Sequence, residues 1–385
     1  MFARVTRGMV HVMKSARLIG SVLAAVAVLA SCGGSDDTSK DKDDNAPAAE
    51  VDAELAAAVE GYLAPPEALT VTEPVSKKAE KKTIAILVCG VVVCEQFADA
   101  EEEAAEELGW TTERIALGTS PEEFAQAADR ALEMKPDAIV ISGLGRELFE
   151  PQLAEAEAAD IPVLFWASTD VAGDGISASI IAKDQYDEIG RHLAEWVAVD
   201  SGGSANIELY SVAQYVTTEA AREAFEARIE EVCPDCKVTV HMVSASDIGT
   251  RMPSIVTGNL QKNPDADYLF CGFGGLCGGV PSALKDAGVT LGGEDGLTIF
   301  SQSGGQTELE GIFNGEQELD ALVPISLTGW HIIDTLQRIF NGDTVVENIP
   351  VQLITKEYVT DPSDPDTGSV EGFRDQYREL WLLNG

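Results

Sequence analysis

The chain alternates short apolar runs with amphipathic segments along most of its length. Residues 83–88 form a continuous apolar run of strand length, which is typical of a strand buried on both faces. The next segment carries Phe97 and Leu108 on one helical stripe and ends at Gly109. Residues 120–123, Ser-Pro-Glu-Glu, form a capping box with proline at the first helical position, so a second helix is predicted to begin there.

The same alternation continues in two series that are separated near residue 184. Further strands are predicted at 137–142, 162–166, 206–210, 237–243, 268–271 and 297–301, and further helices at 150–159, 189–197, 218–232, 255–263 and 279–287. Such alternation produces parallel sheets with helices on both faces, so the fold class is α/β with two lobes. Ligands of open parallel sheets bind beyond the carboxyl ends of the strands. The candidate binding loops therefore begin at Cys89, Ser142, Ala167, Ser211, Cys271 and Gln302.

The N-terminal region has the pattern of a secretion signal. Basic residues occur between positions 4 and 17, and a 13-residue apolar run covers 18–30. This run is shorter than the roughly 18 residues that a membrane-spanning helix needs. Its end, Leu-Ala-Ser-Cys at 29–32, is similar to the lipobox of bacterial lipoproteins, in which the cysteine is acylated. We therefore expect a lipoprotein signal peptide at 1–31 and a lipid anchor on Cys32; the alternative is an ordinary cleaved signal with an incidental cysteine.

Two segments follow before the regular pattern begins. Residues 32–50 contain no large apolar side chain and are expected to form a disordered tether. Residues 51–82 combine a short apolar helix with Pro65-Pro66 and a lysine-rich stretch, which we interpret as a lead-in helix and linker. The whole chain has 385 residues and a formal net charge of −39, a surface that repels phosphate backbones and anionic lipids. Binding to nucleic acid is therefore not expected.

Apart from Cys32, the cysteines fall into three close pairs, Cys89/Cys94, Cys233/Cys236 and Cys271/Cys277. In the oxidising compartment that a secretion signal implies, such pairs predict disulfides. The C-x-x-C spacing of Cys233 and Cys236 also permits a redox function, but nothing around it is thioredoxin-like, so a structural staple is favoured. No histidine lies near these cysteines, which argues against a zinc site. We expect no metal and no cofactor.

The order of elements resembles a type I periplasmic binding protein of the ribose-binding group that serves ABC importers. The stretches that carry the resemblance are Lys-Pro-Asp-Ala-Ile-Val-Ile at 135–141, Ala-Asp-Ile-Pro-Val at 159–163 and Ile-Pro-Val-Gln-Leu-Ile-Thr-Lys at 349–356. The resemblance implies two lobes joined by three crossings that close on a solute. It places the N-terminal lobe at 83–183 plus 324–354 and the C-terminal lobe at 184–323 plus 355–385.

Enzymatic motifs are missing from the pattern. His192, His241 and His331 each lie inside a predicted strand or helix, where a lone histidine is more often structural. The glycine-rich stretch at 273–279 lacks the Lys-Ser/Thr that would hold phosphate and Mg²⁺. Repressors with this fold need an N-terminal DNA-binding helix pair, whereas the secretion signal occupies that end. We therefore expect a binding protein and no enzyme.

The chain departs from the sugar-binding members at their charged ligand contacts. Their contact positions fall on Ala167 and Ser168, Arg222, Phe273, Ser303 and the neighbourhood of Val323. Among these residues only Arg222 keeps the charge that the family uses to clamp sugar hydroxyls. Arg222 is either such a clamp or a surface residue paired with Glu219 or Glu226.

Aromatic and neutral polar residues occupy the candidate positions instead. The candidate ligand-binding residues are Trp166, Ser168, Gln214, Tyr215, Arg222, Phe273, Gln302 and Ser303. Trp166 could contact ligand or belong to the core, whereas Trp330 is favoured as a core residue. Aromatic faces stack on sugar C–H groups but equally on apolar rings.

The function expected from these residues is that of a substrate-binding lipoprotein of an ABC importer. It would act as a monomer on the extracytoplasmic face of the cell membrane and pass a sugar or sugar-like solute to a membrane permease. The alternatives are a less polar, aromatic-ring solute, and a sensory receptor lobe that is not coupled to transport.

Overall fold

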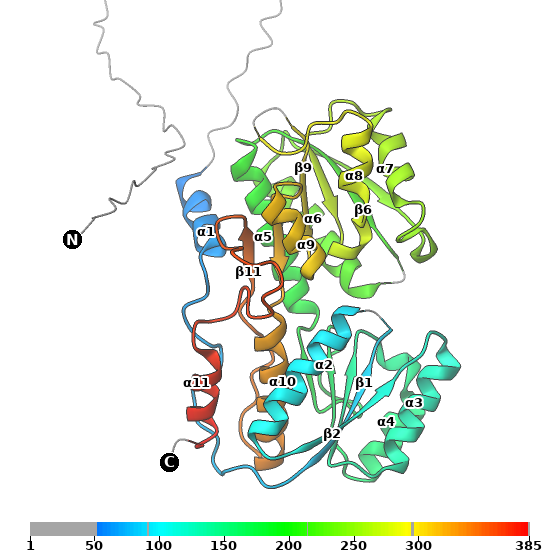
Figure 1. Cartoon of the computed structure of the whole chain (residues 1–385), viewed down its shortest axis with the longest axis vertical. Coiled ribbons are helices and arrows are strands. Elements are labelled where there is room, and N and C mark those ends of the chain that lie inside the picture. Colours follow the sequence, from blue (N-terminus) through cyan, green and yellow to red (C-terminus); the bar gives the residue numbers. More distant parts are fainter. Residues whose placement is uncertain (1–51, 91, 214, 294–295, 384–385) are drawn as a thin grey trace, which may run out of the picture. The chain divides into compact units, whose positions relative to one another are not determined.

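The structure is a computed structural model that describes residues 52–90, 92–213, 215–293 and 296–383 (Figure 1). The predicted signal peptide, the tether, Cys32 and Gln214 lie outside the described residues. Within the described ranges, no helix has both the length and the apolar character needed to span a bilayer.

The first sheet has five parallel strands in the order β2-β1-β3-β4-β5. The strands are β1 (Thr83–Val88), β2 (Thr111–Ala116), β3 (Ala138–Ser142), β4 (Val163–Trp166) and β5 (Ala178–Ile180). Its helices are α2 (Val92–Glu107), α3 (Pro121–Glu133) and α4 (Glu150–Ala158), with a 3₁₀ turn η1 (Arg146–Leu148). Alternate residues of β1 face opposite sides: Ile84 and Ile86 pack with α2, whereas Ala85 and Leu87 pack with α3 and α4. The sheet is therefore covered on both faces, as Figure 1 shows.

The second sheet has six strands in the order β11-β10-β9-β8-β6-β7, all parallel except for the pairing of β10 with β11. The strands are β6 (Asn206–Ser211), β7 (Lys237–Met242), β8 (Tyr268–Cys271), β9 (Thr298–Gln302), β10 (Leu319–Leu322) and β11 (Gln352–Thr355). The helices are α5 (Lys183–Asp200), α6 (Val216–Val232), α7 (Met252–Leu260), α8 (Val280–Asp286) and α9 (Gln306–Asn314), with 3₁₀ turns η2 (Ala245–Asp247) and η3 (Gly274–Cys277). Phe225 of α6 packs with Phe270 and Phe300 on one face, and Val256 of α7 packs with Leu269 on the other. The two-lobe α/β fold class predicted from the sequence is confirmed.

The chain returns to the first lobe after β10 through α10 (Ile325–Asn341), which packs along α2. The helix α11 (Phe373–Leu380) then lies beside α10 (Figure 1). Arg374 and Arg378 of α11 pair with Glu103 and Glu107 of α2, respectively. The sequence assigns 355–385 to the C-terminal lobe, whereas these ion pairs hold α11 to a helix of the first sheet.

The lead-in segment is attached to both lobes. Its helix α1 (Ala53–Leu63) packs against α5 of the second lobe. The following residues, 64–82, then run to the first lobe, where the backbone N–H of Val75 donates to the carbonyl of Leu380 (2.9 Å). Arg338 and Gln337 of α10 donate to the carbonyls of Glu73 and Lys77 (2.7 and 3.2 Å). The lead-in is thus an ordered strap, because side chains of α10 hydrogen-bond its backbone.

Candidate functional site

The candidate loops leave the carboxyl ends of the parallel strands, where a ligand site of this fold class is expected. Two of them are closed by disulfides. Cys89 is joined to Cys94 after β1, and Cys271 is joined to Cys277 after β8. The third disulfide, Cys233–Cys236, closes the turn after α6. These are the three pairs that the sequence predicts.

A polar network connects the loops after β8 and β9 in the second lobe. Gln302, the last residue of β9, is buried, and its amide Nε2 donates to the carbonyl of Gly272 (2.7 Å). The Ser303 hydroxyl in turn donates to Gln302 Oε1 (2.7 Å). The Gln302 side chain therefore holds the loop that carries Phe273, and the neighbouring Ser303 hydroxyl fixes the orientation of the Gln302 amide.

Two aromatic residues meet beside this network. The rings of Tyr215 and Phe273 lie edge to face with 5.5 Å between their centroids. Tyr215 is 40% exposed although it packs on another ring, which leaves one face of the pair open to solvent. Such a face suits stacking on the C–H groups of a sugar or on an apolar ring.

Two carboxylates accept hydrogen bonds from the backbone of the loop that follows Ser303. Asp320 Oδ1 accepts from the backbone N–H of Gly304 (3.0 Å), and Asp320 Oδ2 accepts from the Ser301 hydroxyl (2.5 Å). Glu308 accepts from the N–H of Gly305 (2.8 Å). Burial raises the pKa of Asp320 to about 7 and also raises the pKa of Glu308. Near neutral pH the Asp320 carboxyl group is consequently only partly ionised.

Trp166 is a core residue in this structure. The ring ends β4, is 5% exposed and lies 4.6 Å from the Phe97 ring. Its indole Nε1 is buried and has no hydrogen-bond partner in the described part of the chain. Of the two roles that the sequence left open, the packing fits the core role, while the unpartnered N–H stays free to donate to a ligand.

Sequence reasoning missed a charged pair close to Ser168. The Ser168 hydroxyl donates to Asp170 Oδ2 (3.0 Å), and Asp170 Oδ1 accepts from Arg146 Nε (3.0 Å). Arg146 lies in the turn after β3, and Asp170 lies four residues after the end of β4. The two residues are 24 positions apart in the chain, so only the parallel pairing of β3 with β4 places them together. The glycines before Arg146 were the available signal for a tight turn there.

Arg222 is engaged by carboxylates of its own helix. Its guanidinium donates to Glu219 Oε2 (2.9 Å) and also pairs with Glu226. Glu219 is itself tied to the Ser211 hydroxyl at the end of β6 (2.5 Å). The ion pairs weighed from the sequence are thus present. They hold Arg222 near the carboxyl end of the second sheet.

The two lobes approach each other near these loops, and a second contact holds Ser303 within its own lobe. A Cβ added at Gly305, after β9, would lie 3.7 Å from the side chain of Val93 at the start of α2. The Tyr186 hydroxyl, on the first helix after the crossing from β5, hydrogen-bonds Ser303 and Thr217. Burial nevertheless raises the pKa of Tyr186 to about 12. Ser303 is therefore bonded to α5, a helix of its own lobe.

Comparison with known proteins identifies the family of this chain. Residues 93–344 match the periplasmic binding protein domain family. The chain belongs to that family. A curated relative, the D-apiose import binding protein of Actinobacillus succinogenes, is 26% identical over 196 residues, which are 50% of this chain and 61% of the relative. The match therefore spans less than two thirds of that relative's length.

Solved structures of the family share the fold. A solute-binding protein of A. succinogenes with bound D-allose superposes with a TM-score of 0.62 at 17% identity, covering 72% of this chain and 98% of the other. The arabinose-binding component of an ABC transporter from Shewanella sp. ANA-3 gives 0.62 at 18% identity, covering 78% and 98%. The family resemblance stated from the sequence is confirmed, and the location that the family implies is extracytoplasmic.

Proposed function

We propose that the protein is the substrate-binding lipoprotein of an ABC importer and captures a sugar or sugar-like solute between its two lobes. The observation that carries this proposal is the placement of the candidate side chains. Most of them lie at or just after the carboxyl ends of strands in both sheets, and the start of α2 approaches the loop after β9 at Val93 and Gly305. The relatives named above, which bind or import pentoses and hexoses, support a sugar as the solute class.

The available chemistry suits a neutral polyol. In the first lobe, Arg146 and Asp170 form a donor–acceptor pair that can bridge vicinal hydroxyls, since charge-assisted hydrogen bonds are stronger than neutral ones. In the second lobe, the ring face of Tyr215 is open for stacking. Closure would be stabilised by as much as the solute prefers the closed state over the open one.

A less polar, ring-containing solute is the second candidate. The observation that favours it is that the charged side chains near the candidate site are already ion-paired. Arg146 and Arg222 are both already paired with carboxylates, whereas the Tyr215–Phe273 pair presents an aromatic edge and face. A ring stacked there would need few new charged contacts.

A thermal-shift screen separates the two solute classes. The panel contains D-apiose, D-allose and L-arabinose on one side, and nucleosides and aromatic acids on the other. A true ligand at 100 times its Kd stabilises the folded protein by about 2.7 kcal/mol, which is a measurable shift in Tm. Stabilisation by a sugar supports the first candidate, and stabilisation by the aromatic compounds alone supports the second. A panel without any shift contradicts both.

Anchoring and transport have their own tests. Cys32→Ala should release the protein from the membrane fraction of cells and abolish its labelling with a radioactive fatty acid.

Genes for an ATPase and a permease beside the gene of this protein favour import, whereas a neighbouring membrane kinase favours a sensory receptor. Sedimentation of the purified protein tests the proposed monomeric state.

A further inference from the structure

The strap, which consists of α1 and residues 64–82, joins the two lobes outside the crossings between them. The crossings are 181–182 between β5 and α5, 323–324 between β10 and α10, and 342–351 between α10 and β11. The strap precedes residues 93–344, which match the family. It is therefore a fourth connection, in addition to the three crossings that the family resemblance implies.

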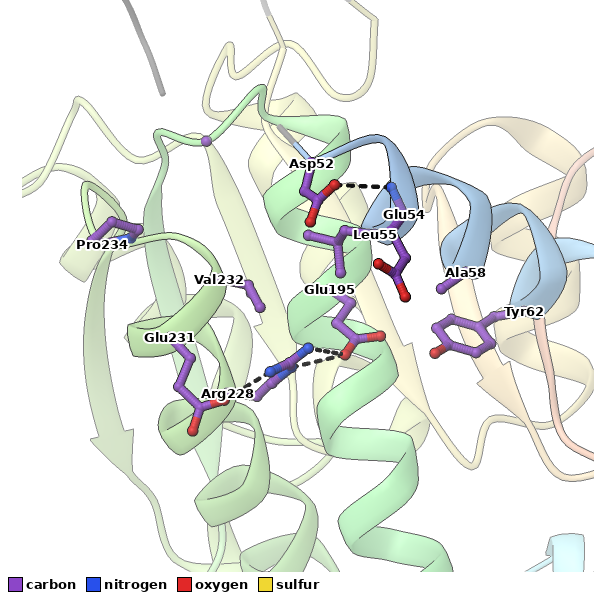
Figure 2. Close-up of a pocket in the computed structure, with 11 residues that line it drawn as sticks. Asp52, Glu54, Leu55, Ala58, Tyr62, Glu195, Arg228, Glu231, Val232 and Pro234 are labelled. Atoms are coloured by element: carbon purple, nitrogen blue, oxygen red, sulfur yellow. Dashed lines mark hydrogen bonds and ion pairs between the residues drawn. The ribbon is translucent and has the colours of Figure 1, made fainter. Parts of the chain in front are cut away.

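One end of the strap is fixed to the second lobe, where α1 packs against α5 and β11. The ring of Tyr62 stacks on His192 of α5 with centroids 3.6 Å apart, and its hydroxyl donates to Glu195 of the same helix. Figure 2 shows the Tyr62 hydroxyl directed at the Glu195 carboxylate. Gln352 of β11 holds the end of α1, because its amide donates to the carbonyl of Leu63 (2.9 Å). This end of the strap therefore moves with the second lobe.

The other end of the strap is fixed to the first lobe, where side chains of α10 donate to its backbone carbonyls. Asn341, the last residue of α10, adds a further hydrogen bond to the carbonyl of Lys77 (2.9 Å). Asp343, just beyond the helix, accepts from the backbone N–H of Ser76 (2.8 Å). The side chain of Val75 is buried in the apolar core. This end of the strap therefore moves with the first lobe.

The span between the two ends, residues 64–72, is stiff and is attached to the third crossing. Pro65 and Pro66 fix their own φ angles, so the span is less flexible than a linker of glycine and serine. The Thr70 hydroxyl donates to the carbonyl of Asn348 in the crossing (2.6 Å). The start of the span borders a cavity of about 610 Å³, whose other wall is formed by α5 and the third crossing. The span thus acts through its two ends and Thr70.

The crossings beside the strap have the properties of a hinge. Ile181, in the first crossing, is buried and has a φ of +55°, in the left-handed region that β-branched residues rarely adopt. Strained backbone of this kind is concentrated at segments that switch between conformations. The first crossing is joined to the third, because Glu347 accepts from the N–H of Ser179 (2.8 Å) and the Gln185 amide donates to the carbonyl of Ile349 (2.6 Å). The strap therefore runs beside the segments that must bend when the lobes move.

We propose that the strap restrains the opening of the two lobes. Val93 of the first lobe lies against Gly305 of the second, and the hydrogen bonds of the strap to both lobes are made in this state. A rotation that separates Val93 from Gly305 also displaces α5 and β11 relative to α10, so it has to deform the span or break the hydrogen bonds at one end. The lobes consequently stay close together before a solute arrives, which leaves less reorganisation for the solute to drive. The effect on affinity rests on the proposed function, whereas the restraint on opening does not.

Lengthening the strap tests the restraint. A Gly-Ser-Gly insertion between Glu67 and Ala68, which are both exposed, adds slack and keeps every bonded residue. The matched control is the same insertion between Met134 and Lys135, two exposed residues of a turn inside the first lobe. We expect small-angle X-ray scattering of the solute-free proteins to give a larger radius of gyration for the strap insertion than for the control. Equal radii of gyration, with circular dichroism showing that both variants are folded, would overturn the proposal.

A second variant loosens the strap without an insertion. The double variant Pro65→Gly with Pro66→Gly removes the stiffness of the span and should also increase the radius of gyration of the solute-free protein. If the strap insertion does not fold, this variant decides, and a radius of gyration equal to that of the unchanged protein overturns the proposal.

The affinity for the solute gives an independent measurement. For the panel compound with the largest thermal shift, the strap insertion should raise the Kd about fivefold, since a smaller fraction of the protein is ready to close. A lower Kd would mean that the strap holds the lobes apart, and would overturn the proposal. If no compound of the panel shifts the Tm, the proposed function fails, while the scattering comparison still decides whether the strap restrains opening.

Discussion

Gly329 of α10 packs directly on Ala100 of α2. A Cβ at position 329 would lie 2.5 Å from the Cβ of Ala100 and 2.7 Å from the backbone N of Glu101. Since the obstructing atoms are backbone and Cβ, no side chain can rotate to make room. The two helices that cover one face of the first sheet are held at this separation by a glycine.

Gly329→Ala should therefore destabilise the protein. The added methyl group forces α2 and α10 apart, and overpacking of this kind costs about 1–3 kcal/mol in the free energy of unfolding. The matched control is Gly258→Ala in α7, where a Cβ meets nothing within 4 Å. The control should gain about 0.5–1 kcal/mol, since alanine restricts the unfolded chain more than glycine does. Urea unfolding of both variants measures the difference, and a neutral Gly329→Ala would contradict the close packing.

The adjacent residue, Glu101, should make stability depend on pH. Glu101 is 1% exposed, neither carboxylate oxygen has a hydrogen-bond partner in the described chain, and burial raises the pKa of this residue to about 8. A raised folded-state pKa stabilises the protein at low pH, and that contribution is lost as the pH rises from about 4.5 through 8. Glu101→Gln keeps the shape without the charge. We expect it to remain stable at pH 9, where the unchanged protein should be weaker by a few kcal/mol, at about 1.4 kcal/mol per unit of pKa.

Chemical unfolding at a series of pH values measures this effect. The exposed Glu157→Gln variant should keep the full pH dependence and serves as the control. If Glu101→Gln loses stability with rising pH as steeply as the unchanged protein does, Glu101 is not the group responsible.

The three disulfides predict that six cysteines are unreactive. Thiol titration with Ellman's reagent, in denaturant and without reductant, should find no free thiol from Cys89, Cys94, Cys233, Cys236, Cys271 or Cys277. Six free thiols would rule the disulfides out. Replacing both Cys271 and Cys277 with serine should raise the Kd of the solute, because a loop that is fixed in advance loses less entropy when the ligand binds. The double serine variant of Cys233 and Cys236, in the turn after α6, is the control.

The aromatic pair should contribute to solute affinity. Phe273→Ala removes the ring on which Tyr215 packs, and Tyr215→Ala removes the exposed face. We expect each to raise the Kd of the solute about tenfold, which corresponds to the 0.5–1.5 kcal/mol typical of aromatic pairs plus lost apolar burial. Met134→Ala is the control, since Met134 is 43% exposed and precedes β3 at the opposite end of the first sheet. An unchanged Kd in both aromatic variants would place the solute elsewhere.

The buried parts of the fold were the easiest to predict from sequence. The strand at 83–88 and the helix start at Ser120 agree with the structure, since a continuous apolar run and a capping box each report local structure. The strand β2 was not predicted. It is an edge strand whose residues alternate in exposure, so its sequence contains polar residues and no continuous apolar run. Its Arg114 is held by three carboxylates of α2, a contact that hydrophobic periodicity does not report.

The candidate site was predictable only in part, for a related reason. The loops could be located because they follow predicted strands, and Gln302, Ser303 and Phe273 lie together as their positions suggest. The sequence did not show which residues form hydrogen bonds or ion pairs with the site side chains. Arg146 forms its ion pair with Asp170 because β3 and β4 are paired, and hydrophobic periodicity does not predict the order of strands in a sheet.

The hydrogen bonds between α10 and the strap decide where a shortened version of this protein can begin. A chain cut to the family boundary at residue 93, or even to β1, would lack the carbonyls that Arg338 and Gln337 bind. Each lost hydrogen bond would remove about 0.5–1.5 kcal/mol of stability, and the side chains that the strap covers, each 2% exposed in the intact protein, would be opened to water. Recombinant expression should therefore start no later than residue 52, with the whole of α1 and its extension retained.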